Sequence, residues 1–222
     1  MGYDEHKKCL VQLIRQAASN SRVATVFADF VECAAIDLSN ILSFSEERAE
    51  RFKRVMVSYS GEERSLFPKM LGHLVMALED RLGDVLGEVY MELGLANEAR
   101  GQFFTPYSVC LLMAKLNSDP AAQVSQRGFV TANDPACGAG ATLIAFADHM
   151  RSEGMNFQKQ LHVVATDVDI QAVHMCYLQL SVIGVPAIVI HGNSLTLKEH
   201  GKWHTPFHHI GFWESRLAAR GA

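Results

Sequence analysis

The sequence predicts an α/β protein in which a helical N-terminal region precedes a shortened, mostly parallel sheet. Two observations predict this class. Apolar residues have helical spacing through the first hundred positions, whereas after residue 125 they form short runs bounded by Gly, Asp and Asn, with helical stretches between them. We therefore expect two regions, a helical region over residues 1–100 and a sheet-containing domain over 101–222.

In the N-terminal region, apolar residues recur three and four positions apart, as helices require. The clearest examples are Leu10, Leu13, Ile14, Ala17, Val23, Val26, Phe27, Phe30, Val31 and Ala34. Ser45 followed by two glutamates is typical of a helix N-cap. Pro68 suits the first turn of a helix, where a missing N–H costs little. We expect four to six helices here and no strands.

Three short apolar runs in the second region have the length and boundaries of buried strands. They cover Phe129–Ala132, Leu161–Ala165 and Ala187–Ile190, and helical stretches over 142–153 and 170–183 separate them. Strand, helix, strand, helix, strand in sequence order requires right-handed crossovers and a parallel sheet. This is half of a doubly wound, Rossmann-like fold.

Composition excludes several broad classes of protein. The 222 residues carry 20 Lys+Arg against 24 Asp+Glu, a net charge of -4, so the chain has no bulk positive field with which to grip nucleic acid unaided. Five cysteines without a C-x-x-C pair indicate reduced thiols in a cytoplasmic protein. We find no apolar run suited to a signal peptide or a membrane span and expect no membrane partner.

The first predicted strand leads into a glycine-containing turn, Asn133-Asp134-Pro135-Ala136-Cys137-Gly138-Ala139-Gly140, and then a helix. Glycines let the backbone approach a ligand, and a helix N-terminus offers free amide donors. A carboxylate at Asp134 would repel a pyrophosphate and attract the cationic amino group of S-adenosylmethionine, which we predict as the cofactor. The alternative is a plain strand-to-helix turn.

The next two predicted strands also end in polar residues. Asp167 follows Gly140 by 27 positions, where its carboxylate can accept both hydroxyls of a ribose. Asn193 offers an amide to an adenine edge. Each residue has a simpler interpretation, since Asp167 or Asp169 can cap a helix and Gly192-Asn193 can form a turn. Three polar strand ends in succession favour a ligand site.

At these residues the sequence resembles the adenine-specific N-6 DNA methyltransferases, and most closely the modification subunit of type I restriction-modification systems. The resemblance covers residues 80–196. It includes Asp84-Val85-Leu86-Gly87-Glu88-Val89-Tyr90 and Gly101-Gln102-Phe103-Phe104-Thr105-Pro106 as well as the strand ends. It implies a Rossmann-like methyltransferase domain, S-adenosylmethionine as cofactor and DNA as substrate.

The resemblance also assigns roles in cofactor binding. Phe104, Thr105 and Pro106 would pack on the methionine end, and Asp134, Gly138 and Gly140 would hold the amino acid part. Asp167 would take the ribose, and Asn193, where the family more often has Asp, would face the adenine. The expected cofactor-binding set is Phe104, Thr105, Pro106, Asp134, Pro135, Ala136, Gly138, Gly140, Asp167, Val168, Asn193 and Ser194.

The family's catalytic motif, Asn or Asp followed by Pro-Pro and an aromatic residue, is missing from this sequence. That motif positions the target amine and stacks the extruded base. Without it, no catalytic residue can be named. Three alternatives stay open: the chain binds cofactor without catalysis, another polypeptide supplies the missing half, or the C-terminal tail replaces the motif.

These alternatives lead to competing functions. The leading hypothesis is DNA adenine methylation, with DNA contacted locally or through a specificity subunit or second methyltransferase subunit. Its rivals are an inactive S-adenosylmethionine-binding module, such as a regulatory partner of a complete modification enzyme, and a methyltransferase acting on protein or a small molecule.

The tail is rich in Trp and His, and it has two interpretations. In the first, Thr205-Pro206-Phe207 stacks a base, and Trp203, Trp213 and the histidines line a pocket. In the second, which we favour, Trp203, Phe207, Phe212 and Trp213 cover an otherwise open sheet edge. The four histidines at 200, 204, 208 and 209 have spacing that suggests a metal, but Pro206 interrupts the helix and no carboxylate or Cys completes a ligand set. We assign no metal. Cys137 lacks a neighbouring base and is not assigned as a nucleophile.

Overall fold

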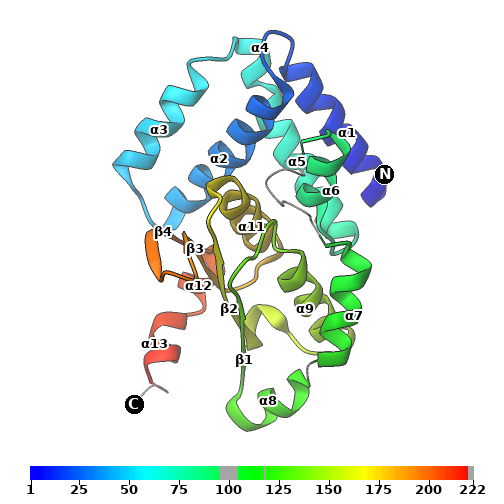
Figure 1. Ribbon diagram of the computed structural model, residues 1–222, viewed down its shortest axis with the longest axis vertical. Coiled ribbons are helices and arrows are strands. Elements are labelled where there is room, and N and C mark those ends of the chain that lie inside the picture. Colours follow the sequence, from blue (N-terminus) through cyan, green and yellow to red (C-terminus); the bar gives the residue numbers. More distant parts are fainter. Residues whose placement is uncertain (96–104, 118, 220–222) are drawn as a thin grey trace. The chain divides into compact units, whose positions relative to one another are not determined.

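The computed structural model describes residues 1–95, 105–117 and 119–219. The chain forms two compact units, residues 1–103 and 104–222 (Figure 1). The described part of the first unit contains helices alone, as the apolar spacing predicts. They are α1 (Tyr3–Ala17), α2 (Val23–Leu42), α3 (Glu46–Met56), α4 (Gly61–Arg64), α5 (Leu66–Asp80) and α6 (Val85–Glu92).

Local sequence signals fix the ends of these helices. The Ser45 hydroxyl accepts the Arg48 N–H and caps α3, which confirms the predicted cap. The buried Asp84 carboxylate accepts the Gly87 N–H at 2.9 Å and caps α6. A Cβ on Gly87 would lie only 1.9 Å from the Asp84 carboxylate, so this helix start requires glycine. The Asp-x-x-Gly part of the family-like segment is therefore explained by helix capping.

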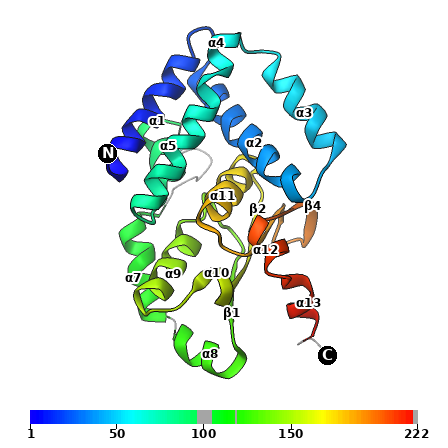
Figure 2. The same ribbon diagram turned by 180° about the vertical axis from the view of Figure 1, so that it is seen from behind.

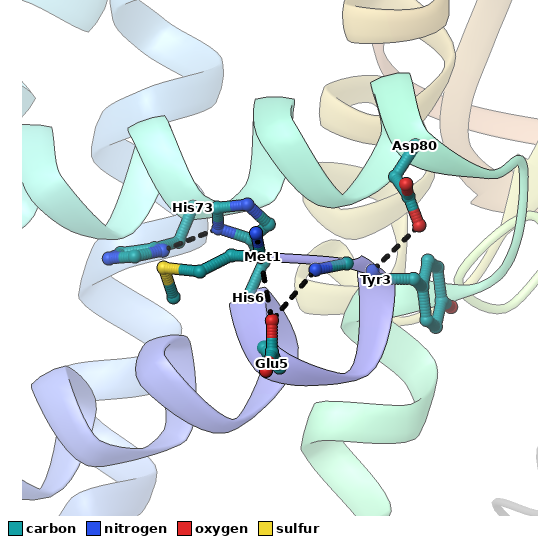
Figure 3. Close-up of polar contacts among 7 residues, drawn as sticks. Met1, Tyr3, Glu5, His6, His73 and Asp80 are labelled. Carbon is teal, nitrogen blue, oxygen red and sulfur yellow. Dashed lines mark hydrogen bonds and ion pairs between the residues drawn. The ribbon is translucent and has the colours of Figure 1, made fainter.

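Polar contacts join α1 to α5 across the helical unit, as Figure 3 shows. The Tyr3 N–H donates to the Asp80 carboxylate at 2.8 Å, and the Nδ1 atoms of His6 and His73 lie 2.9 Å apart. Burial and the neighbouring His6 lower the pKa of His73. His73 therefore favours its neutral form, in which its Nδ1 can share one hydrogen bond with the Nδ1 of His6.

The second unit contains a four-stranded sheet in the order β1-β2-β3-β4. Its elements are α7 (Tyr107–Asn117), α8 (Pro120–Arg127), β1 (Val130–Asp134), α9 (Ala141–Ser152), α10 (Phe157–Gln160), β2 (Leu161–Asp167), α11 (Ile170–Ile183), β3 (Ala187–Asn193), β4 (Lys198–His204), α12 (Pro206–Ile210) and α13 (Trp213–Ala218). The pairs β1–β2 and β2–β3 are parallel, as predicted, whereas β4 is an antiparallel strand that the sequence analysis missed.

One face of this sheet packs on α9 and α11, which follow β1 and β2 in the chain (Figures 1 and 2). Val163, Ala165 and Val189 are completely buried on this face. Trp203 of β4 pairs with Val189 and packs its indole on Tyr177 of α11, with ring centroids 5.3 Å apart. The parallel strands thus bury one face under their own crossover helices.

The C-terminal tail packs at the amino end of the strands. The Thr205 hydroxyl donates to Val185 O and accepts the Ala187 N–H, each at 2.8 Å. The Trp213 ring is fully buried and lies 5.0 Å from the ring of Phe129. Thr205 and Trp213 thus lie at the end of the sheet opposite the carboxyl ends, and their packing within the fold does not support the hypothesis that this segment stacks a base beside the predicted cofactor site.

The favoured interpretation of the tail, shielding of the sheet, holds for part of it. Trp203 belongs to the strand that covers the outer edge of β3, and Trp213 is buried. Phe212, in contrast, is 75% exposed and covers little. Burial of two of the aromatic residues, rather than ligand binding, is the role that their positions support.

Candidate functional site

The three parallel strands place their polar ends at one edge of the sheet. Asp134 pairs with Ala165 near the end of β2, and Asp167 pairs with His191 near the end of β3. Asn193 is the last residue of β3. The residues that the sequence analysis singled out at 134, 167 and 193 therefore come together at the carboxyl edge, where open α/β sheets bind their ligands.

The glycine-containing turn after β1 is tied to the end of β2 by main-chain bonds. The Cys137 N–H donates to Thr166 O at 3.0 Å, and the Gly138 N–H donates to the Asp167 carboxylate at 2.9 Å. Gly138 and Gly140 have φ of +53° and +95°, which L residues rarely adopt. A Cβ on Gly140 would also meet Cys176 Sγ at 3.0 Å. The backbone conformation of this turn therefore favours glycine at both positions.

Asp134 holds the same turn from its other side. Its carboxylate accepts the Ala136 N–H at 3.1 Å and a hydrogen bond from the Thr142 hydroxyl in the first turn of α9. Pro135 and Ala136 are exposed between these contacts. The carboxylate therefore shapes the turn while lying beside the N-terminus of α9.

Asp167 and Asp169 accept hydrogen bonds from different parts of the chain. Asp169 is the N-cap of α11 and accepts the Gln171 N–H at 2.9 Å. Asp167 accepts the N–H groups of Gly138 and Asp169, one on each carboxylate oxygen, and so links the glycine turn to the start of α11. The helix-cap interpretation applies to Asp169, and it leaves Asp167 at the site with further lone pairs for ligand hydroxyls. Val168 between them is 64% exposed.

Asn193 supports a turn as well as facing the edge. Its Oδ1 accepts the N–H groups of Leu195 and Thr196, both at 3.0 Å, so this acceptor is committed to the turn between β3 and β4. Gly192 is buried at a bulge, and a Cβ there would lie 2.7 Å from Lys198 O. A side-chain amide can accept through Oδ1 and donate through Nδ2, and in Asn193 only donation by Nδ2 remains available for a ligand.

Phe104 lies outside the described residues, but Thr105 and Pro106 can be placed. Both are exposed, and they immediately precede α7. The thiol of Cys110 in α7 contacts Thr105 O at 3.7 Å, and its side chain packs with Ala141 at the start of α9. This packing positions the Thr105-Pro106 segment relative to the same helix N-terminus that follows the glycine turn.

A pocket of about 280 Å³ opens beside this edge. Its lining residues are Asn133, Pro135, Thr166, Ile190, Gly192, Asn193, Ser194, Leu197, Lys198 and Glu199. Three of them, Pro135, Asn193 and Ser194, belong to the predicted cofactor-binding set. The sequence analysis did not include Asn133 or Leu197 in the site. Leu197 reaches this pocket only because β3 and β4 form a hairpin, which the sequence analysis did not predict.

Burial disfavours the charged forms of Cys176, His162 and His208. A hydrogen bond with Cys137 and complete burial raise the pKa of Cys176 well above its ordinary value. The rings of His162 and His208 meet at 3.0 Å, and burial first, then neighbouring histidines, lower the pKa of each to about 4. Within the described residues, no group of His, Cys, Asp and Glu has an arrangement able to hold a metal ion.

The carboxyl edge fits the predicted cofactor. Among the described residues, neither Asp134 nor Asp167 forms an ion pair with Lys or Arg, so both carboxylates offer uncompensated negative charge to a cationic ligand. Gly138 and Gly140, both at positive φ, carry no side chain that would separate the backbone of the turn from a ligand. Carboxylates for an ammonium group and for ribose hydroxyls, with an open turn between them, suit S-adenosylmethionine.

Comparisons with known proteins agree with the fold. A crystal structure from Listeria monocytogenes, described as a class I S-adenosylmethionine-dependent methyltransferase, aligns with a TM-score of 0.50 at 14% identity, over 97% of this chain and 70% of that one. At this identity the likeness shows the fold alone. A search of curated proteins gives no significant match.

The sequence also matches the model of the N-6 DNA Methylase family over residues 49–211. This match and the shared fold imply S-adenosylmethionine as the cofactor. No helix in the described ranges is long and apolar enough to cross a membrane. The family match spans well over half of the residues of this chain. The chain, which has a methyltransferase fold, therefore belongs to the N-6 DNA methylase family.

Proposed function

We propose that this protein transfers a methyl group from S-adenosylmethionine to the N-6 amine of adenine in DNA, in a cytoplasmic restriction-modification setting. The observation that carries the proposal is the carboxyl edge of the sheet, where Asp134, Asp167 and the glycine turn converge and the carboxylates lack a cationic partner among the described residues. Family membership supports DNA as the substrate.

The residues at this edge have distinct proposed roles. Asp134, with the turn through Pro135, Ala136, Gly138 and Gly140, holds the amino acid part of the cofactor. Asp167 accepts the ribose hydroxyls. The amide of Asn193 donates to the adenine, while Val168 and Ser194 flank it.

The proposal places the segment before α7 at the methionine end of the cofactor, with Thr105 and Pro106 as its described members. When bound, S-adenosylmethionine would supply an electrophilic methyl group with its sulfur as the leaving group, and the acceptor amine would release its proton to solvent. The protein's task is to align that amine with the methyl group and to exclude water.

With a net charge of -4, this chain has no overall positive charge to attract the DNA phosphates. We propose that DNA binds through local contacts, with a specificity subunit or a second methyltransferase subunit supplying further positive charge. Such sharing accords with the salt-dependent phosphate contacts on which DNA binding depends.

A second candidate is a cofactor-binding module without catalysis. One observation favours it: the chain after β3 turns back into the antiparallel strand β4, and the sequence carries no Asn/Asp-Pro-Pro-aromatic motif. In this case the protein would bind S-adenosylmethionine and act as a regulatory partner of a complete modification enzyme.

Calorimetric titration with S-adenosylmethionine, followed by tritium transfer to mixed-sequence DNA, separates these functions. Saturable binding near one equivalent together with DNA labelling supports the methyltransferase. Binding without labelling, with and without added candidate subunits, supports the module, and labelling of protein or small molecules in the absence of DNA would replace DNA as the substrate. No binding by a folded, cofactor-free sample would overturn both.

A further inference from the structure

A second pocket lies within the helical unit, among residues of α2, α3, α4 and α5 (Figure 1). Its volume is about 180 Å³, and most of its walls are apolar side chains, among them Phe30, Ala34, Phe52, Met56 and Phe67. An apolar cavity of about 150 Å³ is known to hold one benzene ring, so this pocket has room for one ring or a short alkyl chain. None of the residues proposed to bind the cofactor lines it.

Aromatic rings form the buried part of this pocket. Phe30 is 1% exposed and Phe67 is 6% exposed, and their ring centroids lie 6.4 Å apart in an edge-to-face arrangement. The ring of Tyr59 packs on Phe67 in the same way, at 4.9 Å. Phe52 and Met56 of α3 are half-buried beside them. Rings that are fixed by their neighbours offer a preformed apolar surface, and the face of each ring attracts cations.

Asp37 is the acidic residue of this pocket. It lines the pocket from α2 and is itself exposed, so its charge lies between the apolar walls and solvent. In the part of the chain that the structure describes, its carboxylate forms no hydrogen bond or ion pair. Partial burial raises the pKa of Asp37, and no cation offsets this effect. The pKa of Cys33, which also lines the pocket, is raised to about 12 by burial and then by nearby carboxylates that include Asp37.

Arg64 is the basic residue of this pocket, and its hydrogen bonds lead away from Asp37. Its Nε donates to Met56 O at 2.9 Å and to Tyr59 O at 2.8 Å. Met56 is the last residue of α3, so the guanidinium lies at the carbonyl end of that helix, where the backbone dipole is negative. Among the described residues, no ion pair joins Arg64 to Asp37. The negative charge of Asp37 is therefore the uncompensated charge of the pocket.

We infer that this pocket binds a compact apolar amine, with the protonated amine against the Asp37 carboxylate and the apolar body between α2, α3 and α5. The ligand's charged group then lies at the exposed residue and its ring or alkyl chain lies on the buried aromatic side chains. A neutral apolar molecule would leave the carboxylate unpaired, and an anion would be repelled. This site goes beyond the proposed methyl transfer and does not depend on it.

Saturation-transfer NMR of the full chain with phenethylamine tests this assignment, and phenethyl alcohol is a neutral ligand of nearly the same shape. Saturating S-adenosylhomocysteine is added first, so that the amine does not report on the carboxylates at the edge of the sheet. We expect the amine to bind about fivefold more tightly than the alcohol, which is the effect of one partly exposed ion pair.

Three variants show whether the binding takes place in this pocket. Asp37→Asn should remove the preference for the amine, and because burial raises the pKa of Asp37, the neutral amide should not weaken folding. Glu47→Gln removes an exposed acidic charge from α3 outside the pocket and should keep the preference. Ala34→Leu fills part of the pocket and should weaken the binding of both ligands by about tenfold, in a sample whose thermal unfolding shows that it is folded.

A preference for the amine that Asp37→Asn removes and Glu47→Gln keeps supports the assignment, whether or not Ala34→Leu folds. Equal binding of the two ligands by the unmodified chain, no binding of either, or a preference that persists in Asp37→Asn overturns it. Neither ligand takes part in methyl transfer, so labelling of DNA, or its failure, leaves each of these outcomes unchanged.

Discussion

The two ends of the same sheet are built in contrasting ways. At the amino end, Trp213 and His162 are buried, and Thr205 ties the start of β3 to the tail through its hydroxyl. At the carboxyl end, Val168 and Leu197 are exposed and carboxylates hold an open turn. The chain thus buries aromatic residues of its tail at one end and leaves exposed side chains around two carboxylates at the other, where we propose that the ligand binds.

This contrast teaches that residue type alone does not identify a site. The tail has the Trp, Phe and His residues that often line ligand pockets, yet Trp203, Trp213 and His208 are packed into the fold. The other end has short polar residues that are typical of turns, yet these converge on one edge. Changes at the amino end should therefore alter stability, whereas changes at the carboxyl end should mainly alter ligand affinity.

The largest effect is expected at the amino end, for Trp213→Ala. Removing a fully buried indole that packs on Phe129 should lower the free energy of unfolding by about 3 kcal/mol, measured by urea denaturation, with cofactor affinity unchanged in the folded fraction. The neighbouring Phe212→Ala, at a 75% exposed position, is the control and should cost under about 0.5 kcal/mol. Equal losses for the two variants would contradict the described packing.

Asp167→Ala tests the carboxyl end. Loss of the carboxylate removes the proposed ribose acceptor and the bond to Gly138 N, so cofactor binding should weaken by about 1–3 kcal/mol in calorimetry. Asp169→Ala is the matched control, because it removes the cap of α11 and leaves the proposed ribose acceptor in place, and it should cost about 1 kcal/mol of stability with little change in affinity. Unchanged affinity in Asp167→Ala would exclude the ribose role.

Acid should weaken the amino end through the His162–His208 pair. Burial lowers both pKa values to about 4 in the folded chain, below the unfolded value near 6.5. The unfolded state therefore binds more protons between pH 6.5 and pH 4, and stability should fall by about 2 kcal/mol as the pH drops through this window. His208→Gln should flatten this dependence, and the exposed His200→Gln should leave it intact. Urea denaturation across that range decides the outcome.

The smallest predicted effect is the difference in stability between two glycine substitutions, one in the glycine turn and one outside it. Gly140 and Gly154 both have positive φ, but a Cβ on Gly140 would meet Cys176 Sγ at 3.0 Å, whereas Gly154 has nothing within 4 Å. Gly154→Ala should cost about 1 kcal/mol for the backbone alone, and Gly140→Ala about 1 kcal/mol more. When Cys176→Ala is added to Gly140→Ala, thermal unfolding should show that part of the difference is recovered. If none is recovered, the glycine turn does not pack against Cys176 of α11 as described.

Much of the architecture could be predicted because its signals are local. Apolar periodicity predicted the helices before residue 95 and the helix Ile170–Ile183, and the three parallel strands were expected within three residues of their observed bounds. The strand β4 was missed because Lys198-Glu199-His200-Gly201-Lys202-Trp203-His204 contains one large apolar residue. Its strand character comes from pairing with β3, which is a contact between distant positions that local spacing does not encode.

The sequence by itself determined the α/β order, the membership of the chain in its family and the residues that end each parallel strand, since these depend on spacing and on short motifs. Only the tertiary structure decided how those residues share their work. It committed Asp169 to a helix cap and the Asn193 oxygen to a turn, joined Asp167 to Gly138, and buried Trp213 at the opposite end of the sheet. Hydrogen-bond partners and burial depend on which segments meet in space, and a linear pattern specifies that only in part.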